Sequence, residues 1–290
     1  MRTIVHLSDL HFGALDDRLL PPLRQAVCEA NPDLIAVSGD LTQRARRSQF
    51  RQAREFLDSL PFHRLVVPGN HDVPLFDLAS RFIDPLRGFR RHITDDLSPE
   101  FADAEILVVG LNSARSMAFS HGPGRLNPKQ ILQATARLNM APPNVVKIVV
   151  THHPFDIPDG HEAHHLVGRA EMAMSWLATV GVDLFLAGHL HVSHISQTAH
   201  RYGIRGHSAL VVQAGTISRR ARGELGSFNV LRVHESRIDV ERHAWSPELD
   251  QFTSLTADVF DRVGDEWRPR ASHHSEAVVT APVLPRELDN

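Results

Sequence analysis

Five short clusters of aspartate, asparagine and histidine are spread along the 290-residue chain. They are Ser8-Asp9-Leu10-His11, Ser38-Gly39-Asp40, Pro68-Gly69-Asn70-His71-Asp72, Thr151-His152-His153-Pro154 and Gly188-His189-Leu190-His191. Imidazole, carboxylate and amide groups without a thiolate suit Mn²⁺, iron or Zn²⁺ better than Cu(I) or an iron–sulfur cluster. The sequence therefore predicts one site for divalent metals, assembled from segments that are far apart along the chain.

The spacing inside the clusters fits a common site. Asp9 and His11 are two residues apart, as are His189 and His191, and in extended backbone both members of such a pair can point the same way. In three clusters a glycine precedes the polar residue and lets the backbone turn tightly. Any single cluster could equally be an ordinary turn, so it is the recurrence in five places that favours a site.

Short runs of β-branched and aliphatic residues lead into the clusters and predict strands that are buried on both faces. The runs are Thr3–Leu7, Leu34–Val37, Leu65–Val67, Ile106–Leu111, Val145–Val150 and Val182–Leu186. Three apolar stripes at helical spacing lie between them: Leu19, Leu23, Val27 and Ala30; Phe50, Ala53, Leu57 and Leu60; Ile131, Leu132, Thr135 and Leu138. This alternation predicts an α/β fold. Ligands bind outside the carboxyl ends of strands in such sheets, so the clusters should meet at one rim.

The chain after His191 has a different texture. Ala209–Gln213, Ser227–Val233 and Arg237–Glu241 are β-rich, with no long helix between them, and predict a second, antiparallel sheet. We predict a catalytic domain over residues 1–245. Residues 246–290 lack clear periodicity and are predicted to form a C-terminal extension that is partly irregular or mobile.

Composition excludes several classes of protein. The net charge of −3, from 31 basic and 34 acidic residues, gives no electrostatic case for binding nucleic acid or a membrane surface. No apolar run approaches the ~18 residues of an integral membrane segment, and no signal peptide is recognisable. The single cysteine, Cys28, excludes an intramolecular disulfide and a CxxC site. These features predict a cytoplasmic protein, and a homo-oligomer is compatible with them.

Taken together, the motifs resemble the signature of the calcineurin-like binuclear metallophosphoesterases. The resemblance spans about residues 3–191, and it implies a four-layer α/β/β/α sandwich whose second sheet includes the β-rich stretch to about residue 245. It also implies two divalent metal ions, Mn²⁺ and/or iron with Zn²⁺ as the alternative. The ligands implied for the first metal are Asp9, His11 and His191, those for the second are Asn70, His152 and His189, and the bridge is Asp40.

His71 and Asp72 are the predicted catalytic residues beyond the ligands. Family analogy places His71 beside the substrate phosphate, where it could donate to a phosphoryl oxygen or protonate the leaving group. Asp72 would accept a hydrogen bond from His71 and fix its tautomer. The alternative for Asp72 is a helix cap before Val73.

Two departures from related subfamilies narrow the implied substrate. Gln43 stands where purple acid phosphatases have a tyrosine, and Gln43-Arg44 replaces the second Asp-Arg of the Ser/Thr protein phosphatase motif. Gly39-Asp40-Leu41-Thr42 instead resembles the class III cyclic-nucleotide phosphodiesterases and their glycerophosphodiesterase relatives. The implied activity is hydrolysis of a small phosphodiester, such as a cyclic nucleotide, by a metal-bridging hydroxide, in preference to a monoester.

Three other functions are open on the sequence. A lipid-directed phosphoesterase, acting on a phospholipid head group or a nucleotide–lipid pyrophosphate, would need an apolar groove, built for example from residues 156–168 and the tail. A nuclease would need a basic, aromatic-lined channel, which one tyrosine and a negative net charge do not favour. A non-catalytic scaffold of the same fold would be expected to lose ligands, and all seven ligand positions are filled.

Overall fold

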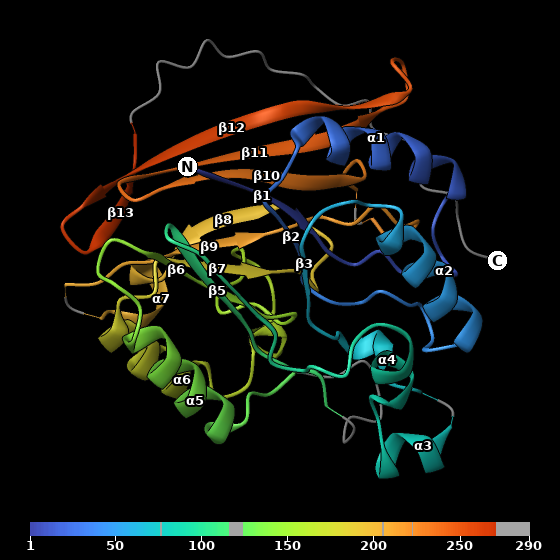
Figure 1. Ribbon diagram of the computed structural model, residues 1–290, viewed down its shortest axis with the longest axis horizontal. Helices are drawn as coiled ribbons and strands as arrows, with labels where there is room; N and C mark the ends of the chain where they lie inside the picture. The colour runs from blue at the N-terminus through green and yellow to red at the C-terminus, as the bar shows by residue number, and fades with distance from the viewer. Residues whose placement is uncertain (76, 116–123, 205, 222, 271–290) are drawn as a thin grey trace.

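The computed structural model of the protein describes residues 1–75, 77–115, 124–204, 206–221 and 223–270. Figure 1 shows two β-sheets packed face to face, with helices on their outer sides. Four layers result, and the expectation of an α/β/β/α sandwich is confirmed.

The first sheet has seven strands in the order β13-β12-β11-β10-β1-β2-β3. The strands are β1 (Arg2–Leu7), β2 (Leu34–Val37), β3 (Arg64–Val66), β10 (Ser227–His234), β11 (Arg237–Ser246), β12 (Gln251–Val263) and β13 (Glu266–Pro269). β1, β2 and β3 are parallel to one another, with Ile4 beside Leu34 in the register. β10 pairs antiparallel with the other edge of β1, and β11 to β13 continue the antiparallel order.

The second sheet has six strands in the order β4-β5-β6-β7-β9-β8. The strands are β4 (Glu100–Ala102), β5 (Ile106–Gly110), β6 (Val146–Val150), β7 (Leu184–Ala187), β8 (His194–Gln197) and β9 (Leu210–Gln213). β5, β6, β7 and β9 are parallel, while β4 and β8 are antiparallel edge strands.

The helices cover the outer faces of the two sheets (Figure 1). The α-helices are α1 (Leu20–Ala30), α2 (Arg47–Asp58), α3 (Leu78–Ile83), α4 (Arg87–His92), α5 (Pro128–Asn139), α6 (Ala170–Leu177) and α7 (Ala199–Tyr202). Short 3₁₀ turns are η1 (Asp17–Leu19), η2 (Asn70–Asp72), η3 (Ala163–His165) and η4 (Ala178–Val180). No helix among the described residues is long and apolar enough to cross a membrane.

Three groups of buried apolar side chains explain why the strand runs are continuously apolar. Ile4 of β1 packs in the group between the two sheets, whereas Val5 and Leu7 pack against α1 and α2 on the other face. A third group joins the second sheet to α5 and α6. Every strand in the centre of the sandwich therefore needs apolar residues on both faces.

One sequence-based expectation about the sheets is wrong. The six apolar runs divide between the two sheets, with β1 to β3 in the first and β5 to β7 in the second. The later β-rich runs do not form an antiparallel sheet of their own, because β10 and β11 extend the first sheet and β9 joins the second in parallel. Period and composition specify a strand but not the partner with which it pairs.

Residues 251–269, within the predicted C-terminal extension, form β12 and β13. Phe252, Phe260 and Trp267 of these strands are buried, while many residues between them are exposed. The predicted boundary falls inside β11, which ends at Ser246. The remainder of the predicted extension, residues 271–290, lies outside the described residues, and the division into a domain and an extension stays a prediction.

Candidate metal centre

The five polar clusters follow the carboxyl ends of β1, β2 and β3 in one sheet and of β6 and β7 in the other. Hydrogen bonds between the loops bring them together: Asp9 N–H donates to Gly39 O over 3.1 Å, and Gly188 N–H donates to His152 O over 3.0 Å. His189 N–H donates to a carboxylate oxygen of Asp9 over 2.9 Å, which links the two sheets at this rim. The structure thus brings together all five clusters, as predicted from the strand ends.

The ligand side chains are aimed by an unusual backbone. Of the nine non-glycine residues with positive φ among those described, five are predicted ligands: Asp9, His11, Asp40, His189 and His191. The left-handed region is costly for residues other than glycine, and such residues concentrate at functional sites. The i, i+2 pairs therefore converge through left-handed turns, not through the extended backbone that the sequence led us to expect.

One half of the site is a buried group of four residues, whose ligand-type atoms all lie within 4.8 Å of one another: Asp9, His11, Asp40 and His191. Nε2 of His11 and Nε2 of His191 are 3.0 Å apart, too close for both to carry protons. Oδ1 of Asp9 is buried and accepts no hydrogen bond from the described residues. Nε2 of His191 lies 3.2 Å from this oxygen. Lone pairs that converge in this way fit a divalent cation.

The other half contains Asn70, His152 and His189. Oδ1 of Asn70 lies 2.9 Å from Nε2 of His152 and 3.2 Å from Nδ1 of His189. The carboxylate of Asp40 stands between the halves, with Oδ2 3.4 Å from His152 Nε2 and 3.7 Å from His11 Nε2. Asp40 is therefore placed between the two groups of ligand-type atoms, and its bridging role stays a prediction. His153 also belongs to a three-histidine group with His152 and His189.

Hydrogen bonds on the outer edge of the rings fix which nitrogen faces the site. Nδ1 of His152 lies 2.8 Å from Ser38 O, and Nδ1 of His191 lies 3.1 Å from Arg220 O. Both rings donate N–H to a carbonyl and leave Nε2 available as a ligand. His189 is reversed, because its Nε2 lies 3.1 Å from Nδ1 of His165 while its Nδ1 faces Asn70.

Charge in the site also favours cations. Burial alone would raise the pKa values of Asp40 and Asp9. The surrounding histidines outweigh burial, chiefly His152 for Asp40 and His191 for Asp9, and hold both pKa values well below the ordinary range. Burial lowers the pKa of His152, but the charge and hydrogen bond of Asp40, the charge of Asp9 and the hydrogen bond to Ser38 together outweigh burial and raise that pKa to about 9. A metal ion must displace this proton from His152 in order to bind, so we expect the affinity for metal to increase as the pH rises.

The predicted catalytic residue His71 lies at the centre. Its backbone N–H donates to Asp40 Oδ1 over 2.8 Å, and its ring centroid is 4.7 Å from that of His11. Nδ1 of the ring lies 2.9 Å from Gln43 O, and Nε2 lies 2.7 Å from Nη1 of Arg220. The Nδ1–H tautomer is therefore fixed by a backbone carbonyl and not, as expected, by Asp72.

Asp72 is fully buried and faces the backbone of two neighbouring loops. Its carboxylate accepts from the N–H groups of Gly69, Thr42 and Leu41 at 3.0, 2.9 and 3.2 Å. Burial, and then the charge of Asp40, raise its pKa to about 7 against these donors. These contacts assign Asp72 to holding the loops that carry Asp40 and Asn70. The helix-cap alternative is wrong, because no helix begins at Val73 in the described part of the chain; Asp72 is the last residue of η2 and accepts from the N–H of Gly69, which precedes that turn.

Arg220 also lies at the site and was not identified from the sequence. Arg220 lies in Gly215-Thr216-Ile217-Ser218-Arg219-Arg220, which follows the apolar run at β9 as the five clusters follow their strands. That recurrence is the signal that could have identified it. His165 precedes α6 in a histidine-containing loop, and nothing local distinguishes it from its neighbours.

The chain is similar to several known proteins. The sequence model described as "Calcineurin-like phosphoesterase" matches residues 2–193. The chain is 25% identical over 165 residues to the glycerophosphodiester phosphodiesterase GpdQ of Enterobacter lignolyticus, covering 53% of this chain and 58% of that protein. It is 26% identical over 162 residues to a probable GpdQ of Arcobacter nitrofigilis, covering 55% and 57%. The matched segments thus span less than two thirds of these relatives.

Among solved structures, a dimetal phosphatase from Danio rerio has a TM-score of 0.63 at 16% identity, covering 88% of this chain and 98% of that one. Identity this low establishes a shared fold alone.

Proposed function

The chain belongs to the calcineurin-like phosphoesterase family, and from this premise we propose that it hydrolyses small phosphodiesters at a binuclear metal centre. The observation that carries the proposal is the position of Asp40. Its carboxylate lies between two groups of ligand atoms, one with Asp9, His11 and His191 and one with Asn70, His152 and His189. A carboxylate shared by two such groups is what a two-metal site requires.

We propose that these seven residues hold two divalent cations, Mn²⁺ and/or iron. When bound, such a pair supplies Lewis acidity, a water nucleophile of lowered pKa and neutralisation of the phosphoryl charge. Asp9 and Asp40 contribute ionised carboxylates, because the surrounding histidines hold their pKa values low. The carbonyls of Ser38 and Arg220 keep the ring edges of His152 and His191 directed at the site.

His71 is the proposed donor to the substrate. It carries no metal, since Nδ1 faces Gln43 O and Nε2 faces Arg220. Its ring stands edge-on to His11, so a phosphate placed at the metals would lie within reach of the imidazole. A hydrogen bond from His71 to a phosphoryl or leaving-group oxygen would stabilise the transition state.

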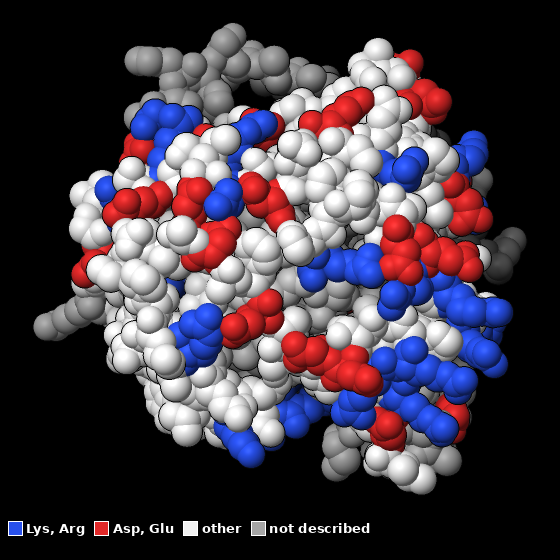
Figure 2. All heavy atoms as spheres, in the orientation of Figure 1, with Lys and Arg blue, Asp and Glu red and all other residues white. Residues whose placement is uncertain are grey.

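A small phosphodiester is the substrate class best supported. The curated relatives are glycerophosphodiester phosphodiesterases by name, and Gly39-Asp40-Leu41-Thr42 resembles the cyclic-nucleotide phosphodiesterases. We therefore propose a glycerophosphodiester or a cyclic nucleotide. A nuclease is less well supported. Figure 2 shows acidic side chains among the basic ones on the face in view, and Asp58 pairs with both Arg54 and Arg64.

The test compares kcat/KM for bis(p-nitrophenyl) phosphate and p-nitrophenyl phosphate, using metal-stripped protein reconstituted with Mn²⁺. Glycerophosphoethanolamine and a 2′,3′- or 3′,5′-cyclic nucleotide complete the panel. We expect the diester to be preferred and at least one natural diester to turn over. A preference for monoesters would overturn the phosphodiesterase assignment and leave the metal centre intact. Full activity in metal-free protein would overturn the mechanism.

A further inference from the structure

Gly215–Arg220, the segment between β9 and β10, approaches the metal centre from outside the family match, which ends at residue 193. Thr216 Oγ1 donates to the backbone carbonyl of Asp9 over 2.6 Å. The backbone carbonyl of Arg220 accepts from Nδ1 of His191 over 3.1 Å. The segment is thus joined to two of the residues proposed to hold the first metal.

The side chain of Arg220 reaches the catalytic face of this centre. Nη1 lies 2.7 Å from Nε2 of His71, which belongs to a loop 149 residues earlier in the chain. A guanidinium has only donors, so it donates and Nε2 of His71 accepts. Nδ1 of His71 already donates to Gln43 O, so His71 can donate to the substrate only after Arg220 has released Nε2 and that nitrogen has taken up a proton. The donor nearest to an arriving phosphate is therefore the guanidinium.

Other contacts hold the segment in place. The hydroxyls of Thr216 and Ser218 are 2.8 Å apart, and Arg220 N–H lies 3.3 Å from Ser218 Oγ. Further along, Glu224 accepts from Arg242 Nη2 over 2.8 Å and from Ser193 N–H over 3.0 Å.

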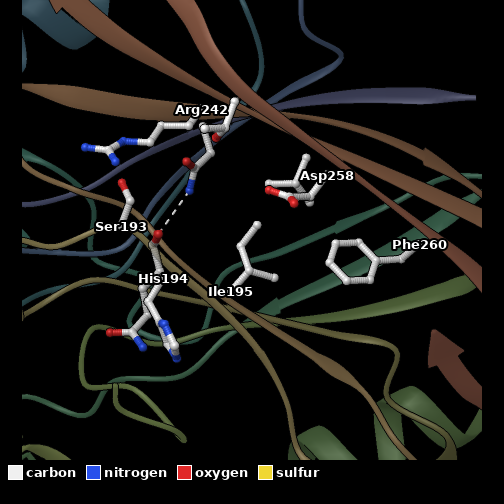
Figure 3. A pocket seen from close by; sticks show the side chains of 10 residues that line it. Ser193, His194, Ile195, Arg242, Asp258 and Phe260 are labelled. Carbon is white, nitrogen blue, oxygen red and sulfur yellow. Dashed lines mark hydrogen bonds between the residues drawn. The ribbon is translucent and has the colours of Figure 1, made fainter. Parts of the chain in front are cut away.

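The last two residues, Ser193 and Arg242, lie at the same end of a cavity of about 320 Å³ between the sheets (Figure 3). None of the described residues that line this cavity is a proposed metal ligand. Contacts therefore hold the chain on either side of Arg220, at the metal centre through Thr216 and at the cavity wall through Glu224, which keeps Arg220 in position before substrate binds.

We propose that Arg220 is a catalytic residue that binds a non-bridging phosphoryl oxygen of the substrate. The inference rests on the proposed function and extends it to recognition of an anionic phosphate. Guanidinium groups suit this task because their charge-assisted hydrogen bonds match phosphate geometry. One guanidinium also balances the single negative charge of a diester. Arg115, the arginine that follows β5, donates instead to Arg125 O over 2.6 Å.

Substrate charge provides the test. Arg220→Ala, Arg220→Lys and the control Arg219→Ala are each loaded with Mn²⁺. Turnover is measured with anionic bis(p-nitrophenyl) phosphate and with neutral diethyl p-nitrophenyl phosphate. Arg219 is a good control because it is the adjacent arginine, its side chain is exposed, and its recorded hydrogen bond is from its backbone to Ala14 O.

We expect Arg220→Ala to lower kcat/KM about 10- to 100-fold for the diester, the usual range for losing a hydrogen bond to a charged group. The neutral triester should change less than about threefold, since it offers no anionic oxygen. Arg220→Lys should recover part of the loss, and Arg219→Ala should behave as wild type. Equal losses on both substrates would overturn the proposal and indicate that Arg220 only positions His71.

Calorimetric titration with inorganic phosphate separates this inference from the proposed function, because it needs no turnover. If wild type binds phosphate, Arg220→Ala should weaken Kd by at least about tenfold at unchanged metal content. An unchanged Kd, or a wild type that binds no phosphate, would overturn the inference. If Arg220→Ala loses its metals, the same comparison is made with Arg220→Lys, which keeps the charge.

Discussion

A methyl group added at Gly69 would collide with the carboxylate that joins the two halves of the metal centre. The backbone there is extended (φ −104°, ψ −178°), so alanine meets no conformational penalty. The new Cβ, however, would lie 2.7 Å from Cγ of Asp40 and closer still to its Oδ1 and backbone N. Ordinary Cβ contacts begin near 3.4 Å, and the backbone atom cannot rotate away, so the loops must separate by about 1 Å.

A displacement of this size decides the magnitude. Ligand positions in metal sites are held to roughly 0.2 Å, and a misplacement of about 1 Å near the chemistry costs on the order of 100-fold in rate. Asp40 Oδ1 also accepts from His71 N–H over 2.8 Å, so His71 moves with it. We expect Gly69→Ala to lower kcat/KM for bis(p-nitrophenyl) phosphate at least about 100-fold. Overpacking should lower the free energy of unfolding by about 1–3 kcal/mol.

The assay combines urea unfolding, metal analysis and kinetics. Gly226→Ala is the matched control, because Gly226 has no positive φ and its added Cβ would come no closer than 3.5 Å to another residue. That variant should match wild type in all three measurements. The reasoning would be refuted if Gly69→Ala kept two metals per chain and an activity within about threefold of wild type. The loops would then tolerate a displacement of Asp40 that should disrupt the metal centre.

Three further predictions concern metals, chemistry and pH. Chelation should abolish hydrolysis, and Mn²⁺ should restore it. In calorimetric titrations Asp40→Ala should weaken the binding of both metals, whereas Asn70→Ala should weaken chiefly one. If the two variants affected metal binding equally, the bridging role of Asp40 would be contradicted. His71→Ala should lower the rate roughly 10²–10⁴-fold while metal analysis still finds the wild-type content; loss of metal would show a structural role instead. Burial, opposed by the charge of Asp9, lowers the pKa of His6 to about 3. Between pH 7 and 5 the unfolded chain therefore takes up a proton that the folded chain does not, and the unfolding free energy should fall by about 2 kcal/mol through this residue. Urea titrations of His6→Gln should lack that part of the pH dependence, and an unchanged slope would contradict the assignment.

Much of the site could be predicted because its signals are local. Each apolar run and the polar residues after it lie within a few residues of one another, so the strand ends and the ligand types are visible in the sequence. The five clusters were identified in this way, and the family resemblance then implied the seven ligands within them: Asp9, His11, Asp40, Asn70, His152, His189 and His191. The structure brings all seven together.

The backbone conformation of these residues could not be predicted in the same way. Asp9 and Asp40 adopt left-handed φ angles of 52° and 50°. Local preference opposes this conformation for residues other than glycine, and the surrounding hydrogen bonds, such as Asp9 N–H to Gly39 O, impose it.

The sequence by itself determined where the five polar clusters lie and that each follows a predicted strand. Only the tertiary structure decided that β1 and β6 belong to different sheets, that β12 and β13 extend the first sheet, and that Arg220 meets His71 across 149 residues. Strand pairing depends on register between distant segments, and a contact such as Arg220 to His71 depends on where two loops finish in space. Neither quantity is encoded in the period or composition of a single segment, because a strand's partner is selected by the packing of the whole chain.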